Sequence, residues 1–215
     1  HHRTLRWIKG RFILVIDHLY HTAETGEKPA VECNWQFGPG AVEIDPAQDR
    51  VHFQLGSTGL LMLLPLKPAR MKPTLHSGEL DPCLGWVADE ADQPVPAPLL
   101  RLRADAFEPW RMDLATFLIP YFSPALPTVQ VTESIDPAQA GYGKVKLRWD
   151  DGSTDEVWWT RRLQTALDRS DRIGTDAALA HVHQGPGGKN VRALIYEGSY
   201  LDPYTKRRAE QRSTF

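Results

Sequence analysis

The sequence predicts an all-β fold, a multi-stranded antiparallel β-sandwich with at most one short helix. The first observation is that 17 prolines and 16 glycines are spread over the 215 residues, so few windows remain for a helix of about 11 residues or more. The second is that short runs alternate apolar and polar residues with a period of two, as half-buried strands do. The third is that turn-forming residues separate these runs at short intervals, which is typical of sandwiches and barrels.

The first third contains the clearest strands. Residues 3–8 and 11–18 are expected to form a hairpin around a turn at Lys9-Gly10. The second of these runs is apolar on both faces, which predicts a buried central strand. Further strands are predicted at 31–37, 41–44, 50–55 and 59–66.

The same pattern continues to residue 197. Strands are predicted at 70–76, 84–88, 99–103, 111–121, 128–133, 144–149, 156–160, 177–183 and 190–197, with a surface loop over 89–98. Residues 150–152, Asp-Asp-Gly, favour a tight hairpin turn. A helix is expected only at 161–172, with a charged loop as the alternative. One sandwich domain, incomplete at its N-terminal side, is expected over 1–201, followed by a charged tail at 202–215.

Composition and motifs exclude several classes of function. Lys and Arg number 25 and Asp and Glu 27, a formal charge of −2, so we expect no nucleic-acid partner. The longest nearly apolar run, 59–66, is far shorter than the roughly 20 residues that span a bilayer, so we expect no membrane partner. No phosphate-binding glycine loop or Cys-x-x-Cys pair occurs, and we expect no cofactor. Cys33 and Cys83 are expected to be separate thiols, with a disulfide as the alternative.

Two groups of polar residues could carry chemistry. His181 and His183 share one face of a predicted strand and could hold a metal with a third ligand, but no third ligand is identifiable by spacing. The alternative is a surface-facing polar row on an edge hairpin, with Val182 toward the core. The run from Asp17 to His21 has the residue types of acid–base catalysis, yet Asp17 lies on the strand face opposite His18, and strand-end polar residues are the alternative. We assign no catalytic residue and no metal ligand.

Adjacent tryptophans offer a different possibility, because exposed aromatic rings stack on sugars. Trp158 and Trp159 follow one another on a predicted strand, so their rings must point to opposite faces. One ring is therefore expected outside the core, at an interface or on a sugar-binding surface. Both are candidate substrate-binding residues, and the alternative is a ring covered by a loop of the same chain.

The hairpin that begins His2-Arg3-Thr4 and continues from Trp7 to Leu19 resembles that of heparinase II/III-like polysaccharide lyases. The strand from Val31 to Gly40 is similar as well, and the segments 150–159, 175–180 and 194–201 resemble the closing strands of the same domain. The likeness covers both ends of the chain and leaves the middle unassigned. Such lyases pair an N-terminal α/α toroid with a C-terminal multi-stranded β-sandwich, and they cleave uronic-acid-containing polysaccharides by β-elimination.

The resemblance implies that this chain is the C-terminal β-sandwich portion of such a lyase, periplasmic or secreted although it opens with no signal peptide. Its partners would be an α/α toroid catalytic domain, of the same or a neighbouring chain, and an acidic polysaccharide. The family's main catalytic and metal-binding segments match no part of the sequence, so the chain alone is expected to be inactive. The alternatives are a non-catalytic carbohydrate-binding or scaffolding β-sandwich, and a β-barrel enzyme or metalloprotein built around His181 and His183.

Overall fold

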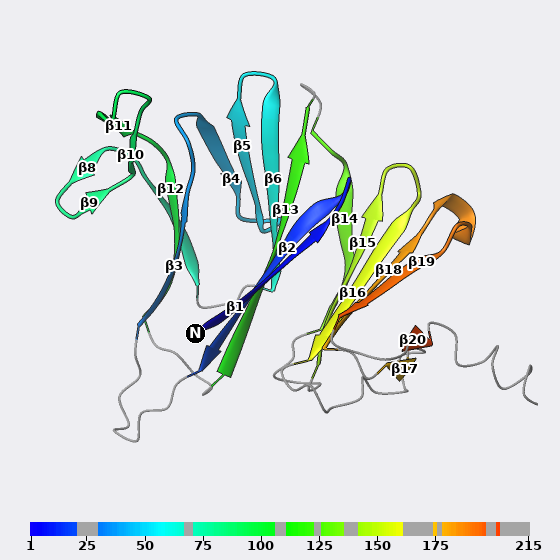
Figure 1. Cartoon of the computed structure of the whole chain (residues 1–215). Helices are drawn as coiled ribbons and strands as arrows, with labels where there is room; N and C mark the ends of the chain where they lie inside the picture. The colour runs from blue at the N-terminus through cyan, green and yellow to red at the C-terminus, as the bar shows by residue number, and fades with distance from the viewer. Residues whose placement is uncertain are drawn as a thin grey trace, which may run out of the picture. The chain divides into compact units, whose positions relative to one another are not determined.

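The structure, a computed structural model, describes residues 1–20, 30–66, 71–105, 111–122, 126–135, 142–160, 174–175, 178–196 and 201–202 (Figure 1). Its elements are strands in several antiparallel sheets, together with one 3₁₀ turn at Pro186–Gly188. The predicted all-β antiparallel fold is therefore confirmed. Within these residues no helix has the length and apolar character to cross a bilayer. The chain divides into two compact units, residues 1–127 and 128–215.

The first unit contains a six-stranded sheet in the order β1-β2-β13-β6-β5-β4. Its strands are β1 (His2–Ile8), β2 (Phe12–Tyr20), β4 (Ala41–Asp45), β5 (Arg50–Leu55), β6 (Thr58–Leu66) and β13 (Arg111–Tyr121). β1 and β2 form the predicted hairpin, and Gly10 in its turn has a φ of 77°, which glycine adopts without strain. β2 lies between β1 and β13, as its two apolar faces predict.

A second sheet completes this unit. It consists of β3 (Val31–Gln36), β12 (Leu99–Ala104) and β7 (Lys72–His76), with β12 in the middle. Leu100 and Leu102 alternate toward one face of β12 and pack with Met62, Leu64 and Leu114 of the larger sheet. Because both sheets contribute buried side chains to this one core, the first unit is a two-layer sandwich in its own right.

Two small hairpins follow β7 and differ from the predicted pattern. They pair β8 (Glu79–Leu80) with β9 (Cys83–Leu84), and β10 (Trp86–Ala88) with β11 (Pro94–Pro96). The predicted strand at 84–88 is broken at Gly85, whose φ is 70°. The loop predicted over 89–98 contains the short strand β11, in which Val95 pairs with Val87. Val95 lies between Pro94 and Pro96, which cannot donate hydrogen bonds to a partner strand.

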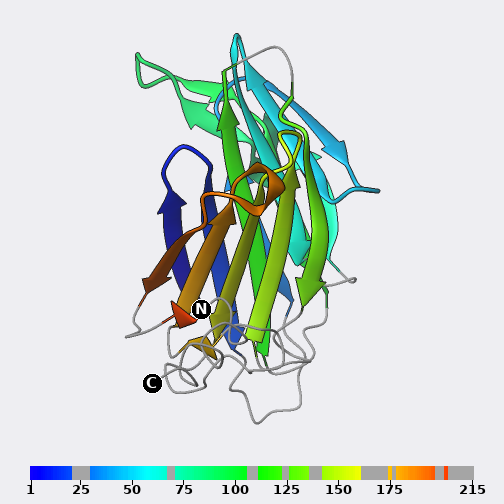
Figure 2. The same ribbon diagram turned by 90° about the vertical axis from the view of Figure 1, so that its right-hand side faces the viewer.

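The second unit contains a five-stranded sheet in the order β14-β15-β16-β18-β19 (Figure 2). Its strands are β14 (Val129–Ile135), β15 (Tyr142–Trp149), β16 (Thr154–Thr160), β18 (Leu179–Gln184) and β19 (Arg192–Tyr196), and a separate pair joins β17 (Gly174–Thr175) to β20 (Leu201–Asp202). The predicted Asp-Asp-Gly turn connects β15 to β16, with Gly152 at a φ of 78°.

Some predictions fall outside the described residues. The helix expected at 161–172 is one, and nearly all of the tail expected at 202–215 is another. The boundary between the units, at Pro127 and Thr128, falls inside the single sandwich domain that the sequence predicts over 1–201.

Candidate functional site

A buried carboxylate in the second unit is hydrogen-bonded to three other side chains. Asp155 on β16 has a side chain that is 0% exposed. Nε2 of His181 and Nδ1 of His183 lie 2.8 and 3.1 Å from its Oδ1, and the indole N–H of Trp149 donates to its Oδ2 at 2.6 Å. A carboxylate only accepts, so both facing imidazole nitrogens carry hydrogens and donate. Three donors thus compensate one buried charge.

Strand alternation and register bring these residues together. His181 and His183 are two residues apart on β18 and share a face, as predicted, while Val182 packs in the small core on the other face. Asp155 is paired with His183 across β16 and β18. The expected edge hairpin is confirmed, because β18 pairs with the edge strand β19. The expected surface position is wrong for His181, which is buried.

The chemistry open to this group follows from its hydrogen bonds. An aspartate that holds an imidazole N–H fixes the tautomer and the ring orientation, which is how a general base is positioned. The side chain of His183 is 21% exposed, so it is the more accessible of the two. Among the residues that the structure describes, no three His, Cys, Asp or Glu side chains are arranged to bind a metal ion.

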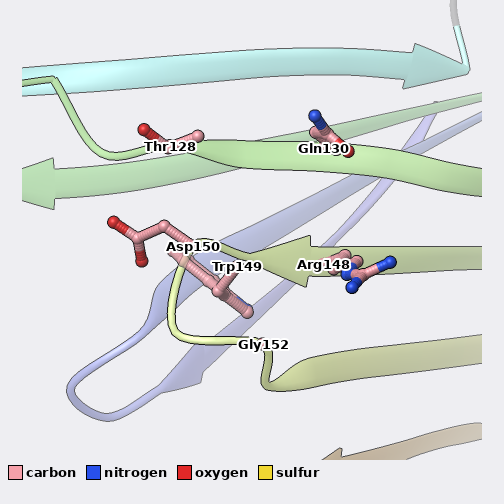
Figure 3. Close-up of a pocket in the computed structure, with 6 residues that line it drawn as sticks. All are labelled: Thr128, Gln130, Arg148, Trp149, Asp150 and Gly152. Atoms are coloured by element: carbon pink, nitrogen blue, oxygen red, sulfur yellow. The ribbon is translucent and has the colours of Figure 1, made fainter. Parts of the chain in front are cut away.

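A pocket of about 210 Å³ lies at the end of this sheet, where β14 and β15 are neighbours (Figure 3). Its lining residues come from the start of β14, the end of β15 and the following turn: Thr128, Gln130, Arg148, Trp149, Asp150 and Gly152. Figure 3 shows Gln130 and Arg148 on neighbouring strands, where they are register partners. Trp149 belongs to both features, since it lines the pocket and its N–H binds Asp155.

Backbone hydrogen bonds fix the shape of the pocket. The N–H of Asp150 donates to the carbonyl of Thr128 at 3.1 Å, which ties the turn to β14. The N–H of Gly152 donates to the carbonyl of Trp149 at 3.0 Å and closes the turn.

Gln130 and Arg148 share one face of the sheet, whereas the indole of Trp149, the next residue on β15, points to the opposite face and to Asp155. The lining residues therefore bring an amide, a guanidinium and the carboxylate of Asp150 to the pocket. This combination suits a ligand rich in hydroxyl groups.

A second buried carboxylate, Asp17, lies in the first unit. Arg3 donates to it from Nε at 2.6 Å and from Nη2 at 2.9 Å, and Nε2 of His1 lies 2.7 Å from Oδ1. The guanidinium of Arg3 also lies over the ring of Trp35, 5.2 Å from its centroid. The hydrogen bonds that Arg3 donates to Asp17 raise the pKa of Arg3. Burial, and then the charge of Asp17, raise the pKa of Cys33 to about 11.

The predicted run from Asp17 to His21 does not form one group. Asp17 and His18 point to opposite faces, as expected, and join different partners. His18 lies 3.0 Å from a carboxylate oxygen of Asp113 on β13, and His21 lies outside the described residues. Cys33 and Cys83 are free thiols, as expected.

Trp158 and Trp159 point to opposite faces of β16, as predicted. Trp158 stands opposite Lys144 and joins the small core with Tyr142, while Trp159 stands opposite Gly143. Both side chains are buried, with residues only 1% exposed. A sugar would have to displace what covers either ring before stacking on it, so their role in substrate binding stays a prediction.

Trp149, Arg148 and Asp155 were not singled out by sequence. No family model matches the chain, and a search of the curated proteins finds no match to it either.

Proposed function

We propose that this chain is the C-terminal β-sandwich portion of a heparinase II/III-like polysaccharide lyase, which cleaves uronic-acid-containing polysaccharide by β-elimination. The main catalytic residues lie outside this chain. The α/α toroid that supplies them belongs to the same or a neighbouring chain, and the acidic polysaccharide is the common substrate.

The observation that carries the proposal is the pair formed by Arg3 and Asp17. Both residues belong to the hairpin on which the resemblance rests, and they are register partners joined by two hydrogen bonds. The ring of Trp35, from the second segment of the resemblance, covers the guanidinium. Segments that are separate in the sequence but similar to one family thus form a single structural unit here, inside an all-β sandwich.

The pocket residues support a division of labour between this chain and the toroid. β-Elimination from a uronic acid needs a base that removes the C5 proton and an acid that protonates the leaving oxygen. The six residues lining the pocket include no Tyr, His or Lys, the usual types for those roles at neutral pH. Asp155 holds His181 and His183 by hydrogen bonds in a separate group, and these three residues do not line the pocket.

The pocket also favours a second candidate, a non-catalytic carbohydrate-binding sandwich. Gln130, Arg148 and Asp150 bring hydrogen-bonding groups to one pocket, and this arrangement requires no catalytic partner.

Two measurements test these proposals. The purified chain should bind alginate or heparan in preference to a neutral glucan in affinity electrophoresis, and it should produce no conjugated double bond absorbing in the ultraviolet. Co-expression with the α/α toroid of a heparinase II/III-like lyase should give a stable complex that does produce it. Absence of binding to every acidic polymer would contradict the lyase proposal. Sustained turnover by the chain alone would contradict the placement of the catalytic residues, and binding without any complex would favour the second candidate.

A further inference from the structure

The β1–β2 hairpin carries positive charge that the rest of the chain does not share. Residues 1–20 contain four basic side chains, Arg3, Arg6, Lys9 and Arg11, and one acid, Asp17. The hairpin therefore has a formal charge of +3, whereas the whole chain has −2 and the remaining residues together have −5. A local excess of this kind attracts anions even when the net charge of the protein is negative.

An exposed aromatic ring lies in the same hairpin. Trp7 is 70% exposed and Leu5, two residues earlier on the same face of β1, is 55% exposed. Arg3 follows in the same row, with 39% of its side chain exposed and its position fixed by Asp17. Trp7 is the fourth residue after Arg3, so the row is about 13 Å long. Among the tryptophans that the structure describes, Trp7 is the one classed as exposed.

The backbone holds this row in place. Every residue of β1 from His2 to Ile8 has a register partner on β2, and β1 is the edge strand of its sheet (Figure 2). On the open side of an edge strand, alternate N–H and C=O groups point away from the sheet and can bond hydroxyl groups. Lys9 and Arg11 stand in the turn between Ile8, which follows Trp7, and Phe12.

We infer that this face of the hairpin, Arg3, Leu5, Trp7, Lys9 and Arg11, binds a stretch of anionic polysaccharide. The ring of Trp7 stacks on the C–H face of a sugar, the two basic side chains of the turn attract its carboxylate or sulfate groups, and the open edge of β1 bonds its hydroxyls. The choice of ligand rests on the proposed function and on charge complementarity. The surface itself is distinct from the pocket at Trp149.

The test is binding of acidic oligosaccharides, of alginate or heparan type, to the full chain by calorimetry and by iodide quenching of tryptophan fluorescence. Trp7→Ala should weaken binding about tenfold or more, as loss of a stacked aromatic does, and ligand should protect Trp7 from quenching. Lys9→Gln should weaken it about two- to fivefold and reduce its salt dependence. The matched controls are Phe122→Ala, an aromatic that is 83% exposed, and Lys72→Gln, which should both bind like the wild type.

The possible outcomes distinguish failure of the Trp7 surface from failure of the proposed function. If the wild type binds acidic oligosaccharides and Trp7→Ala binds them equally well, the surface is wrong while the proposed function stands. If the wild type binds none of them, the proposed function fails and this inference with it. Single-stranded DNA bound as tightly as the oligosaccharide would overturn the choice of ligand. A dimer seen by light scattering, in which Trp7 is shielded without ligand, would instead assign the hairpin to a second copy of the chain.

Discussion

Replacing Asp155 by Asn tests whether the buried carboxylate holds the second unit together. The substitution keeps the size of the side chain and turns one accepting oxygen into an NH₂ donor. Oδ1 faces the two histidines and Oδ2 faces the indole N–H of Trp149. As long as His181 and His183 keep their hydrogens on the facing nitrogens, the NH₂ group meets at least one donor whichever way the amide turns.

The cost follows from these contacts. The less damaging orientation points the amide oxygen at His181 and His183 and opposes the NH₂ to the N–H of Trp149. An unsatisfied buried donor costs about 1–3 kcal/mol, and the remaining bonds lose the strength that the negative charge gave them. We therefore expect the free energy of unfolding to fall by about 2–4 kcal/mol.

Urea denaturation of the full chain, followed by circular dichroism and tryptophan fluorescence, measures this loss. The matched control is Asp150→Asn in the neighbouring turn, where the side chain is exposed and accepts one bond, from the N–H of Asp151. An amide oxygen can accept that bond equally well, so the control should unfold like the wild type. If Asp155→Asn were also within about 0.5 kcal/mol of the wild type, the network would contribute nothing and the reasoning would be wrong.

Two further predictions concern buried positions. Iodoacetamide at pH 8 should label exposed Cys83 much faster than Cys33, since burial and then Asp17 raise the pKa of Cys33 to about 11 from 9.0; equal rates by mass spectrometry would contradict this. Because the unfolded thiol ionises first, the same shift makes the folded state lose stability as the pH rises from about 9 toward 11, and Cys33→Ser should remove that component of the pH dependence. Gly143→Ala should destabilise the chain by about 1–3 kcal/mol or more, because its Cβ would overlap Cε2 of Trp159. Gly38→Ala, whose Cβ would lie 4.0 Å from Phe53, should be nearly neutral in the same denaturation experiment.

The fold could be predicted because alternation records which face each residue occupies. The opposite directions of Trp158 and Trp159 and the shared face of His181 and His183 both follow from a period of two. Alternation does not record which faces of a sheet are covered, and this is why the histidines were expected at a surface. Pairing with β19 satisfies the backbone edge of β18, whereas burial of His181 depends on what packs over the face to which its side chain points.

The candidate site was missed for a related reason. The predicted strand at 156–160 begins one residue after Asp155, although that residue continues the inward alternation of Val157 and Trp159. If β16 had been paired with β18, Asp155 would have fallen at an inward position close to His181 and His183. That combination would have indicated the site. The boundary at Pro127 also had a signal, since Pro120, Pro124 and Pro127 lie close together, but prolines are frequent along the whole chain.

The position of β13 in its sheet has a consequence for the order in which the chain can fold. β13 pairs with β2 on one side and with β6 on the other, and both neighbours are synthesised long before it. Hairpin β1–β2 and the antiparallel run β4–β5–β6 can form locally, but each leaves a hydrophobic strand with an unpaired edge until Arg111–Tyr121 emerges. Pairings between such distant segments fold slowly. Until β13 is available, the unpaired edges of β2 and β6 are both exposed. Nascent chains can then associate with one another through either edge, so this topology favours aggregation during folding.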